Sequence, residues 1–306
     1  MTRVHIAKQR TQQRLQADGL LLLAAGIWGL AFVAQRLGSQ DLGYFMFNGL
    51  RFLVGAFVLL PFLRFKIRIP RGKIPGVLLA GILLFAGSNL QQAGIAGTTA
   101  GQASFLTSVY VVLVPVFWVV FWRRRLGWVI WVAALMAALG AGVMNLSGKL
   151  DMVVGNTIVL LSTVPWALQV IVVGVLVQDV DPLHFAVAEF LVCGSLSLGL
   201  GLLFQPSTMA NIAAALLPVI YTGIFSVGVG FTLQAVGQRH APPAEAAIIM
   251  SLEAVFGALF GWWLLGERMT WQQITGCLLV FAAILLAQWQ AYRPQKTGGN
   301  SLGVVD

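Results

Sequence analysis

Residues 241–288 read APPAEAAIIMSLEAVFGALFGWWLLGERMTWQQITGCLLVFAAILLAQ. Two apolar runs, 244–265 and 274–289, flank the polar turn GERMTWQQ. Each run has about the length, roughly 20 residues, that a helix needs to cross a bilayer. A carboxylate, Glu253, stands near the middle of the first run, where insertion of a charge costs around 3 kcal/mol. The stretch therefore predicts two membrane-spanning helices with an ionisable group inside the bilayer.

The same pattern occurs earlier in the chain, at residues 100–138. The matching pairs are Ala244 with Ala100, Val255 with Val111, Trp262 with Trp118, Arg268 with Arg124 and Leu279 with Leu135. Matches continue outside this stretch, where Trp28 corresponds to Trp166, Arg51 to Glu189 and Gln91 to Gln234. The chain is therefore an internal repeat over nearly its whole length.

Composition excludes a water-soluble domain. Of the 306 residues, 58% are hydrophobic and 9% are charged, against about 25% charged in soluble domains. The net charge of +9 comes from basic residues in short loops, which favours a role in membrane topology over nucleic-acid binding. The two cysteines lack CxxC spacing, and no nucleotide-binding, metalloprotease or hydrolase motif occurs. No catalytic residue, metal, cofactor or nucleic-acid partner is expected, and the protein is not expected to be an enzyme.

Ten apolar runs predict an all-α integral membrane protein with ten transmembrane helices, because continuous runs of this length exclude the alternation of barrel strands. The runs are 18–37, 44–63, 75–96, 101–121, 127–146, 155–177, 183–204, 212–236, 244–265 and 271–291. They divide the chain into a basic N-terminal segment at 1–17, repeats of five helices at 18–146 and 155–291, and a disordered tail at 292–306.

Five helices per copy is an odd number, so the second repeat should enter the membrane from the opposite side. The loop FLRFKIRIPRGK (62–73) carries five basic residues, whereas its counterpart FQPSTMAN (204–211) carries none. Loops that face opposite compartments differ in this way. The basic loops at 62–73 and 123–125 and both termini are expected in the cytoplasm, with Lys149 outside, in a multi-pass protein of the cytoplasmic (inner) membrane.

Several short motifs resemble those of a known family. They are Trp28-Gly29, Asn48-x-x-Arg51-Phe52, Leu252-Glu253-x-Val255-Phe256, Trp262-x-x-Leu265-Gly266-Glu267 and Ile274-x-Gly276. The chain resembles the EamA-type exporters of the drug/metabolite transporter superfamily over about residues 18–290. The resemblance implies ten helices in two EamA repeats and the export of small metabolites such as amino acids or drugs. It also predicts a weaker helix kink after Glu253, because many members have proline where this chain has Ala254.

Glu253 is the candidate for proton coupling or for binding a substrate amine; the alternative is a carboxyl group that holds two helices together. Arg51 and Glu189 occupy equivalent positions, and Arg51 can pair with Glu189, with Glu253 or with a substrate carboxylate. A structural ion pair and a role in binding are both open. Intramembrane polar residues are either ligands or the hydrogen-bonding contacts between helices that membranes favour.

Two further sets of residues complete the candidate site. Asn89 and Gln92 are three residues apart on one helix face and are the preferred cavity pair, whereas Trp28 and Trp166, deep in their spans, are candidates for stacking on substrate. The full candidate set for substrate binding or coupling is Glu253, Arg51, Glu189, Trp28, Trp166, Asn89, Gln92, Gln234, Thr107 and Tyr110.

The leading hypothesis is a secondary active exporter of small metabolites that works by alternating access between the repeats, with protons as the candidate coupling ion. An uncoupled facilitator is the alternative, and a membrane scaffold is the third class. The expected partners are a small-molecule substrate and the lipid bilayer. Gly257-x-x-x-Gly261 favours packing within one chain over a dimer contact, so a monomer or weak homodimer is expected.

Overall fold

The computed structural model describes residues 2–122, 128–145 and 150–292, and every regular element in this part of the chain is helical. The α-helices are α1 Thr2–Gly38, α2 Tyr44–Leu59, α3 Ile74–Ile95, α4 Ala100–Thr107, α5 Tyr110–Trp122, α6 Trp128–Asn145, α7 Leu150–Leu176, α8 Pro182–Phe204, α9 Met209–Ala214, α10 Leu216–Tyr221, α11 Thr232–Gln238, α12 Pro243–Met250, α13 Glu253–Leu265 and α14 Trp271–Tyr292. The other elements are the 3-10 turns η1 Leu60–Leu63 and η2 Arg71–Lys73 and the π-helical η3 Thr222–Phe231.

Eight stretches of these helices are long and apolar enough to cross a membrane. The spans expected fifth and tenth are helices as well, α6 and α14, but their apolar stretches over the described residues are shorter, at Trp131–Gly140 and Trp271–Ala283. The first helix begins at Thr2, so residues 2–17 continue into the first span rather than forming a separate segment. Residues 123–127, 146–149 and 293–306 lie outside the described residues, together with the predictions made for residues 123–125, for Lys149 and for the tail.

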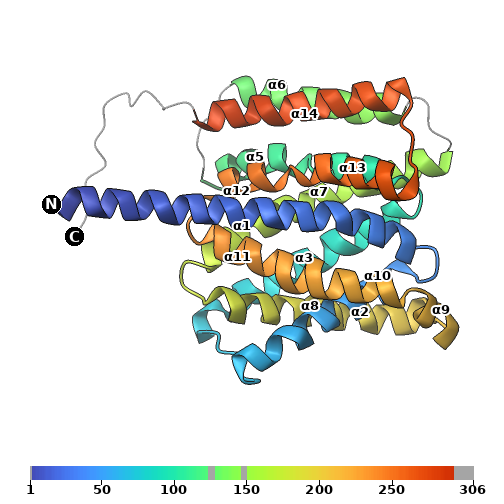
Figure 1. Cartoon of the computed structure of the whole chain (residues 1–306), viewed down its shortest axis with the longest axis horizontal. Coiled ribbons are helices and arrows are strands. Elements are labelled where there is room, and N and C mark those ends of the chain that lie inside the picture. Colours follow the sequence, from blue (N-terminus) through green and yellow to red (C-terminus); the bar gives the residue numbers. More distant parts are fainter. Residues whose placement is uncertain (1, 123–127, 146–149, 293–306) are drawn as a thin grey trace.

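Helices that occupy equivalent positions in the two repeats lie against each other. In the bundle of Figure 1, α2 packs along its equivalent α8, and α6 packs along its equivalent α14 at one edge. The two repeats also meet where α3 packs along α7, the helix that corresponds to α1. Small residues permit the closest crossings, since a Cβ atom on Gly94 would lie 2.6 Å from the carbonyl oxygen of Gly155. Gly257 and Gly261 likewise meet Ser104 and Glu267 of the same chain. The repeats are thus interlocked rather than arranged as two separate bundles.

One span of each repeat is interrupted near its middle. The first interruption separates α4 from α5 at residues 108–109, and the second separates α12 from α13 at residues 251–252. The Ser104 and Ser108 hydroxyls donate to the carbonyl oxygens of Ala254 (3.1 Å) and Ser251 (3.3 Å), so the two interruptions meet across the repeats. The span is interrupted at residues 251–252 although no proline stands beside Glu253.

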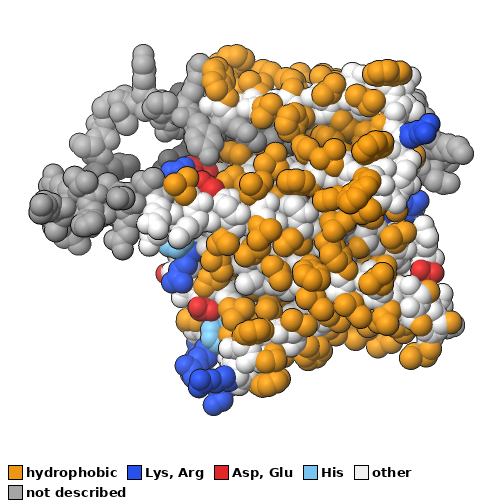
Figure 2. Space-filling view, viewed as in Figure 1, with side chains coloured by type: hydrophobic (Ala, Val, Ile, Leu, Met, Phe, Trp, Pro, Cys, Tyr) orange, Lys and Arg blue, Asp and Glu red, His pale blue; other side chains and the backbone are white. Residues whose placement is uncertain are grey.

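The outer surface of the bundle is apolar. Figure 2 shows hydrophobic side chains over the whole flank of the molecule, with charged side chains gathered at its two ends. Large side chains such as Leu203, Leu217 and Trp263 are more than two-thirds exposed. A flank of this kind is solvated by lipid, and the charged ends lie at the two membrane surfaces.

Candidate functional site

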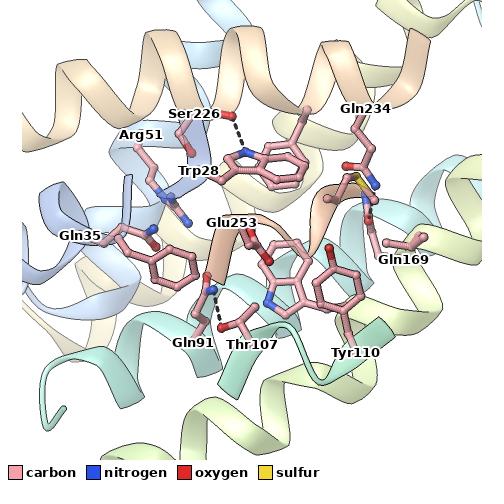
Figure 3. Close-up of a pocket in the computed structure, with 15 residues that line it drawn as sticks. Trp28, Gln35, Arg51, Gln91, Thr107, Tyr110, Gln169, Ser226, Gln234 and Glu253 are labelled. Carbon is pink, nitrogen blue, oxygen red and sulfur yellow. Dashed lines mark hydrogen bonds between the residues drawn. The ribbon is translucent and has the colours of Figure 1, made fainter. Parts of the chain in front are cut away.

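A central cavity with a free volume of about 40 Å³ lies between the two repeats. Ten elements contribute to its wall, and both helix interruptions border it (Figure 3). The lining residues are Trp28, Phe32 and Gln35 of α1, Arg51 of α2, Gln91 of α3, Thr107 of α4, Tyr110 of α5, Trp166, Gln169 and Val170 of α7, Ser226 and Phe231 of η3, Gln234 of α11, Met250 of α12 and Glu253 of α13.

Two tryptophans from equivalent positions line the cavity. Both rings pack on Phe231, with centroid distances of 4.9 Å for Trp28 and 5.9 Å for Trp166. The indole Nε1 of Trp28 donates to the carbonyl oxygen of Ser226 at 3.1 Å. The Nε1 of Trp166 is buried and has no partner among the described residues. The cavity therefore combines an aromatic wall with one unused hydrogen-bond donor.

Arg51 is the cation of the cavity. Its Nε donates to Asn48 Oδ1 at 2.7 Å, and its guanidinium carbon lies 4.8 Å from the centroid of the Phe52 ring. Asn48 is itself held by Asn89, at 3.0 Å. The terminal nitrogens of Arg51 form no hydrogen bond or ion pair with any described residue, and the group points into the cavity in Figure 3. A fixed guanidinium with free terminal nitrogens suits a carboxylate or another planar anion.

Glu253 is the carboxylate of the cavity and the first residue of α13. The residue is only 5% exposed, and its carboxylate has no hydrogen-bond or ion-pair partner among the described residues. The amino-terminal end of a helix stabilises a negative charge through its unpaired N–H groups. No group of three or more histidine, cysteine or acidic side chains that could hold a metal occurs in the part of the chain that the structure describes.

Glu189 lies behind the cavity wall instead of lining it. Its Oε2 accepts from Gln169 Nε2 at 3.4 Å, and Gln169 Oε1 accepts from Gln234 Nε2 at 3.2 Å. Gln169 and Gln234 both reach the cavity. Neither Glu189 nor Glu253 forms an ion pair with Arg51, so the structural ion pair left open by the sequence does not form in this conformation.

The preferred cavity pair, Asn89 and Gln92, does not line the cavity. Asn89 is committed to Asn48 and to Ser197, and Gln92 donates to the carbonyl oxygen of Gln35. Gln91 lies between them in sequence and is the residue of α3 that reaches the cavity, where it donates to Thr107 Oγ1 at 3.0 Å. Spacing identified a shared helix face but not which face is turned toward the cavity.

Seven of the ten candidate residues meet at the cavity. They are Trp28, Arg51, Thr107, Tyr110, Trp166, Gln234 and Glu253. Gln35 and Gln169 were missed, although each is a polar residue deep in an apolar run and that signal was available. Phe231 and Met250 carry no such signal, because an apolar residue in an apolar run has no distinguishing mark.

Together the fold and the site define a class: a multi-pass helical membrane protein whose two repeats enclose a polar cavity beside interrupted helices. Residues 15–146 and 153–289 each match the EamA-like transporter family. The chain belongs to that family, and it is a membrane transporter by class.

Relatives in several microorganisms are similar along most of their length. An uncharacterized transporter of Archaeoglobus fulgidus is 29% identical over 90% of this chain and 86% of its own. The uncharacterized inner membrane transporter YedA of Escherichia coli K12 is 26% identical over 94% and 95%. The uncharacterized transporter YoaV of Bacillus subtilis is 22% identical over 85% and 92%. One crystal structure, 19% identical, covers 90% of this chain and 99% of its own with a TM-score of 0.69, which supports the fold alone.

Proposed function

We propose that the chain is a secondary active exporter of small metabolites that carry a carboxylate and an amine beside an apolar group. It works in the cytoplasmic membrane, with both termini in the cytoplasm and with protons as the coupling ion. The observation that carries this proposal is the presence of Arg51 and Glu253 in one cavity, each without a charged partner. The guanidinium of Arg51 and the carboxylate of Glu253 do not pair with each other, so both are available to a substrate.

The substrate class follows from the chemistry of the lining. Arg51 offers donors to a carboxylate, Glu253 accepts from an amine, and Trp166 offers one further donor. The faces of Trp28 and Phe231 are available to cover an apolar substituent. The free volume of about 40 Å³ is below the range of small-molecule sites, roughly 300–1,000 Å³, so the cavity has to widen from this conformation to admit a substrate. Amino acids meet this chemical description.

Alternating access is supported by the symmetry of the interruptions. Transporters built from inverted repeats bind substrate near the midplane beside discontinuous helices that occur at corresponding places in the two halves. Here Thr107 and Tyr110 flank one interruption, while Met250 and Glu253 flank the other. Movement of one repeat against the other changes which end of the cavity is open.

The test of proton coupling is Glu253→Gln in proteoliposomes with a panel of radiolabelled amino acids. The carboxyl group can alternate between protonated and ionised forms, and the amide cannot. We expect the variant to exchange substrate at equal pH on both sides, but to lose accumulation driven by a pH gradient. Glu245→Gln is the matched control because it removes a carboxylate from the same span at a position outside the cavity, and its accumulation should be unchanged.

Two results would overturn parts of the proposal. Gradient-driven accumulation that persists in Glu253→Gln would favour the uncoupled facilitator. If the native chain exchanges cations but no zwitterion, and Arg51→Lys and Arg51→Gln do the same, the proposed substrate class is wrong in requiring a carboxylate.

A further inference from the structure

A segment at one end of the bundle contains a cluster of basic residues that are not part of the transport site. Residues 60–73, called here the basic segment, join α2 to α3 through η1 and η2. The side chains of Arg64, Lys66, Arg68 and Arg71 are exposed. Figure 2 shows a cluster of basic side chains at a lower corner of the molecule, next to the apolar flank.

Few carboxylates are available to neutralise this charge. The sequence has no Asp or Glu between Asp41 and Asp151. Asp179 pairs with Lys73, and Asp181 caps the amino-terminal end of α8 by accepting from the backbone of Leu183 and His184. The other four cations of the basic segment form no ion pair with any described residue. They are therefore available to an external anion.

Aromatic side chains accompany these cations. Phe62 and Phe65 are 75% and 73% exposed, although both are apolar. They alternate with Arg64 and Lys66 along a segment that adjoins the lipid-facing end of α2. Apolar rings beside basic groups bind at the boundary between headgroups and acyl chains, where the rings enter the apolar layer and the cations meet phosphate groups.

The backbone of the basic segment is fixed. Arg64 and Phe65 adopt the left-handed conformation with φ of 51° and 57°, in a turn closed by hydrogen bonds to the carbonyl oxygens of Pro61 and Leu60. Farther along, the backbone N–H of Arg68 donates to His184 Nδ1 at 3.1 Å, which ties the segment to α8. The cations are thus displayed on a held loop, so little order has to be gained on binding.

We propose that the basic segment is a binding surface for the headgroups of anionic phospholipids. The equivalent loop at the opposite end, residues 204–211, has no charged residue. In this pair of equivalent loops, the positive charge that can bind anionic lipid is therefore confined to the basic segment. This interaction is additional to the transport site and does not rest on the proposed function.

The test compares spin-labelled phosphatidylglycerol with spin-labelled phosphatidylcholine in proteoliposomes of the full chain. Electron spin resonance gives the relative association of the two lipids with the protein, whichever way the protein is oriented. The native chain should prefer phosphatidylglycerol, and Arg64→Gln combined with Arg68→Gln should reduce that preference by about threefold or more. Arg64→Lys combined with Arg68→Lys keeps the charge and should retain the preference.

The matched control removes two arginines at the other end, Arg36→Gln with Arg268→Gln, and should leave the preference unchanged. An unchanged preference in the first variant, or an equal fall in the control, would overturn the proposal. Phe62→Ala with Phe65→Ala should also weaken the preference.

Discussion

Trp28 and Trp166 are related by the repeat, but their indole N–H groups have different environments. Trp28 Nε1 donates to Ser226 O, a carbonyl in the π-helical η3, whereas Trp166 Nε1 has no partner among the described residues. The corresponding stretch of the first repeat lies in the regular helix α3. π-helical segments are uncommon and occur frequently at functional sites. The indole N–H of Trp28 is therefore used within the fold, whereas that of Trp166 is not.

Replacing each tryptophan by phenylalanine separates these roles. Trp166→Phe keeps an aromatic face and removes a donor that the fold does not use, so we expect substrate affinity to fall about tenfold, or ~1.4 kcal/mol, with unfolding unchanged. Trp28→Phe removes a buried hydrogen bond to the carbonyl oxygen of Ser226 and should lower the free energy of unfolding by about 1 kcal/mol. Substrate Kd and chemical unfolding in detergent measure the two effects. Equal loss of stability in both variants would contradict the distinction.

At the scale of elements, the two repeats are joined at the ends of helices as well as along their sides. After α13, Gly266 adopts a left-handed conformation with φ of 63°, which turns Glu267 back toward the first repeat. The two Glu267 oxygens accept from the backbone N–H groups of Ala100 (2.7 Å) and Gly101 (3.0 Å) at the start of α4. A second-repeat carboxylate thus caps a first-repeat helix.

Glu267→Gln should therefore destabilise the fold. The amide keeps one acceptor but turns an NH₂ group toward a helix N–H and loses the charge that favours a helix amino-terminal end. We expect the free energy of unfolding to fall by about 1–2 kcal/mol. Glu245→Gln is the control, because its exposed ion pair with Arg14 should contribute less than about 1 kcal/mol. Equal shifts in thermal unfolding for the two variants would rule out the capping role.

The sequence predicts an element well when the physical cause of that element is local in the sequence. Long apolar runs predict helices because lipid leaves no other partner for backbone N–H and C=O groups. The interruption at 251–252 carries no proline: the Ser251 hydroxyl donates to the carbonyl oxygen of Ile248, and the Ser108 hydroxyl donates to the Ser251 carbonyl oxygen from the other repeat. The choice of Gln91 over Gln92 likewise depends on the rotation of α3 about its axis, which is set by packing. The sequence therefore identified Glu253 and Arg51 as residues of the cavity, but it could not predict which neighbouring side chains face the cavity.

At the scale of the whole molecule, the inverted repeat requires equivalent loops to face opposite compartments. The basic segment and its counterpart before α9 lie at opposite ends of the bundle, and only the first is charged (Figures 1 and 2). The excess of Lys and Arg at the end of the basic segment predicts that this end faces the cytoplasm, since positive residues are retained there during insertion. The uncharged loop is then expected on the outer side.

Single cysteines test this orientation in intact cells. Arg68→Cys and Met209→Cys lie in the two equivalent loops, and both native side chains are exposed. They would be introduced after Cys193→Ser and Cys277→Ala remove the buried native thiols. A membrane-impermeant maleimide should label Met209→Cys in intact cells and Arg68→Cys only after permeabilisation. Labelling of both from outside would contradict the inverted arrangement, whereas the opposite pattern would keep the inversion and reverse the orientation. A further variant combines Arg68→Cys with replacement of Arg64, Lys66 and Arg71 by Gln. Part of its population should then be labelled at position 68 in intact cells, because the positive charge that retains the loop in the cytoplasm has been removed.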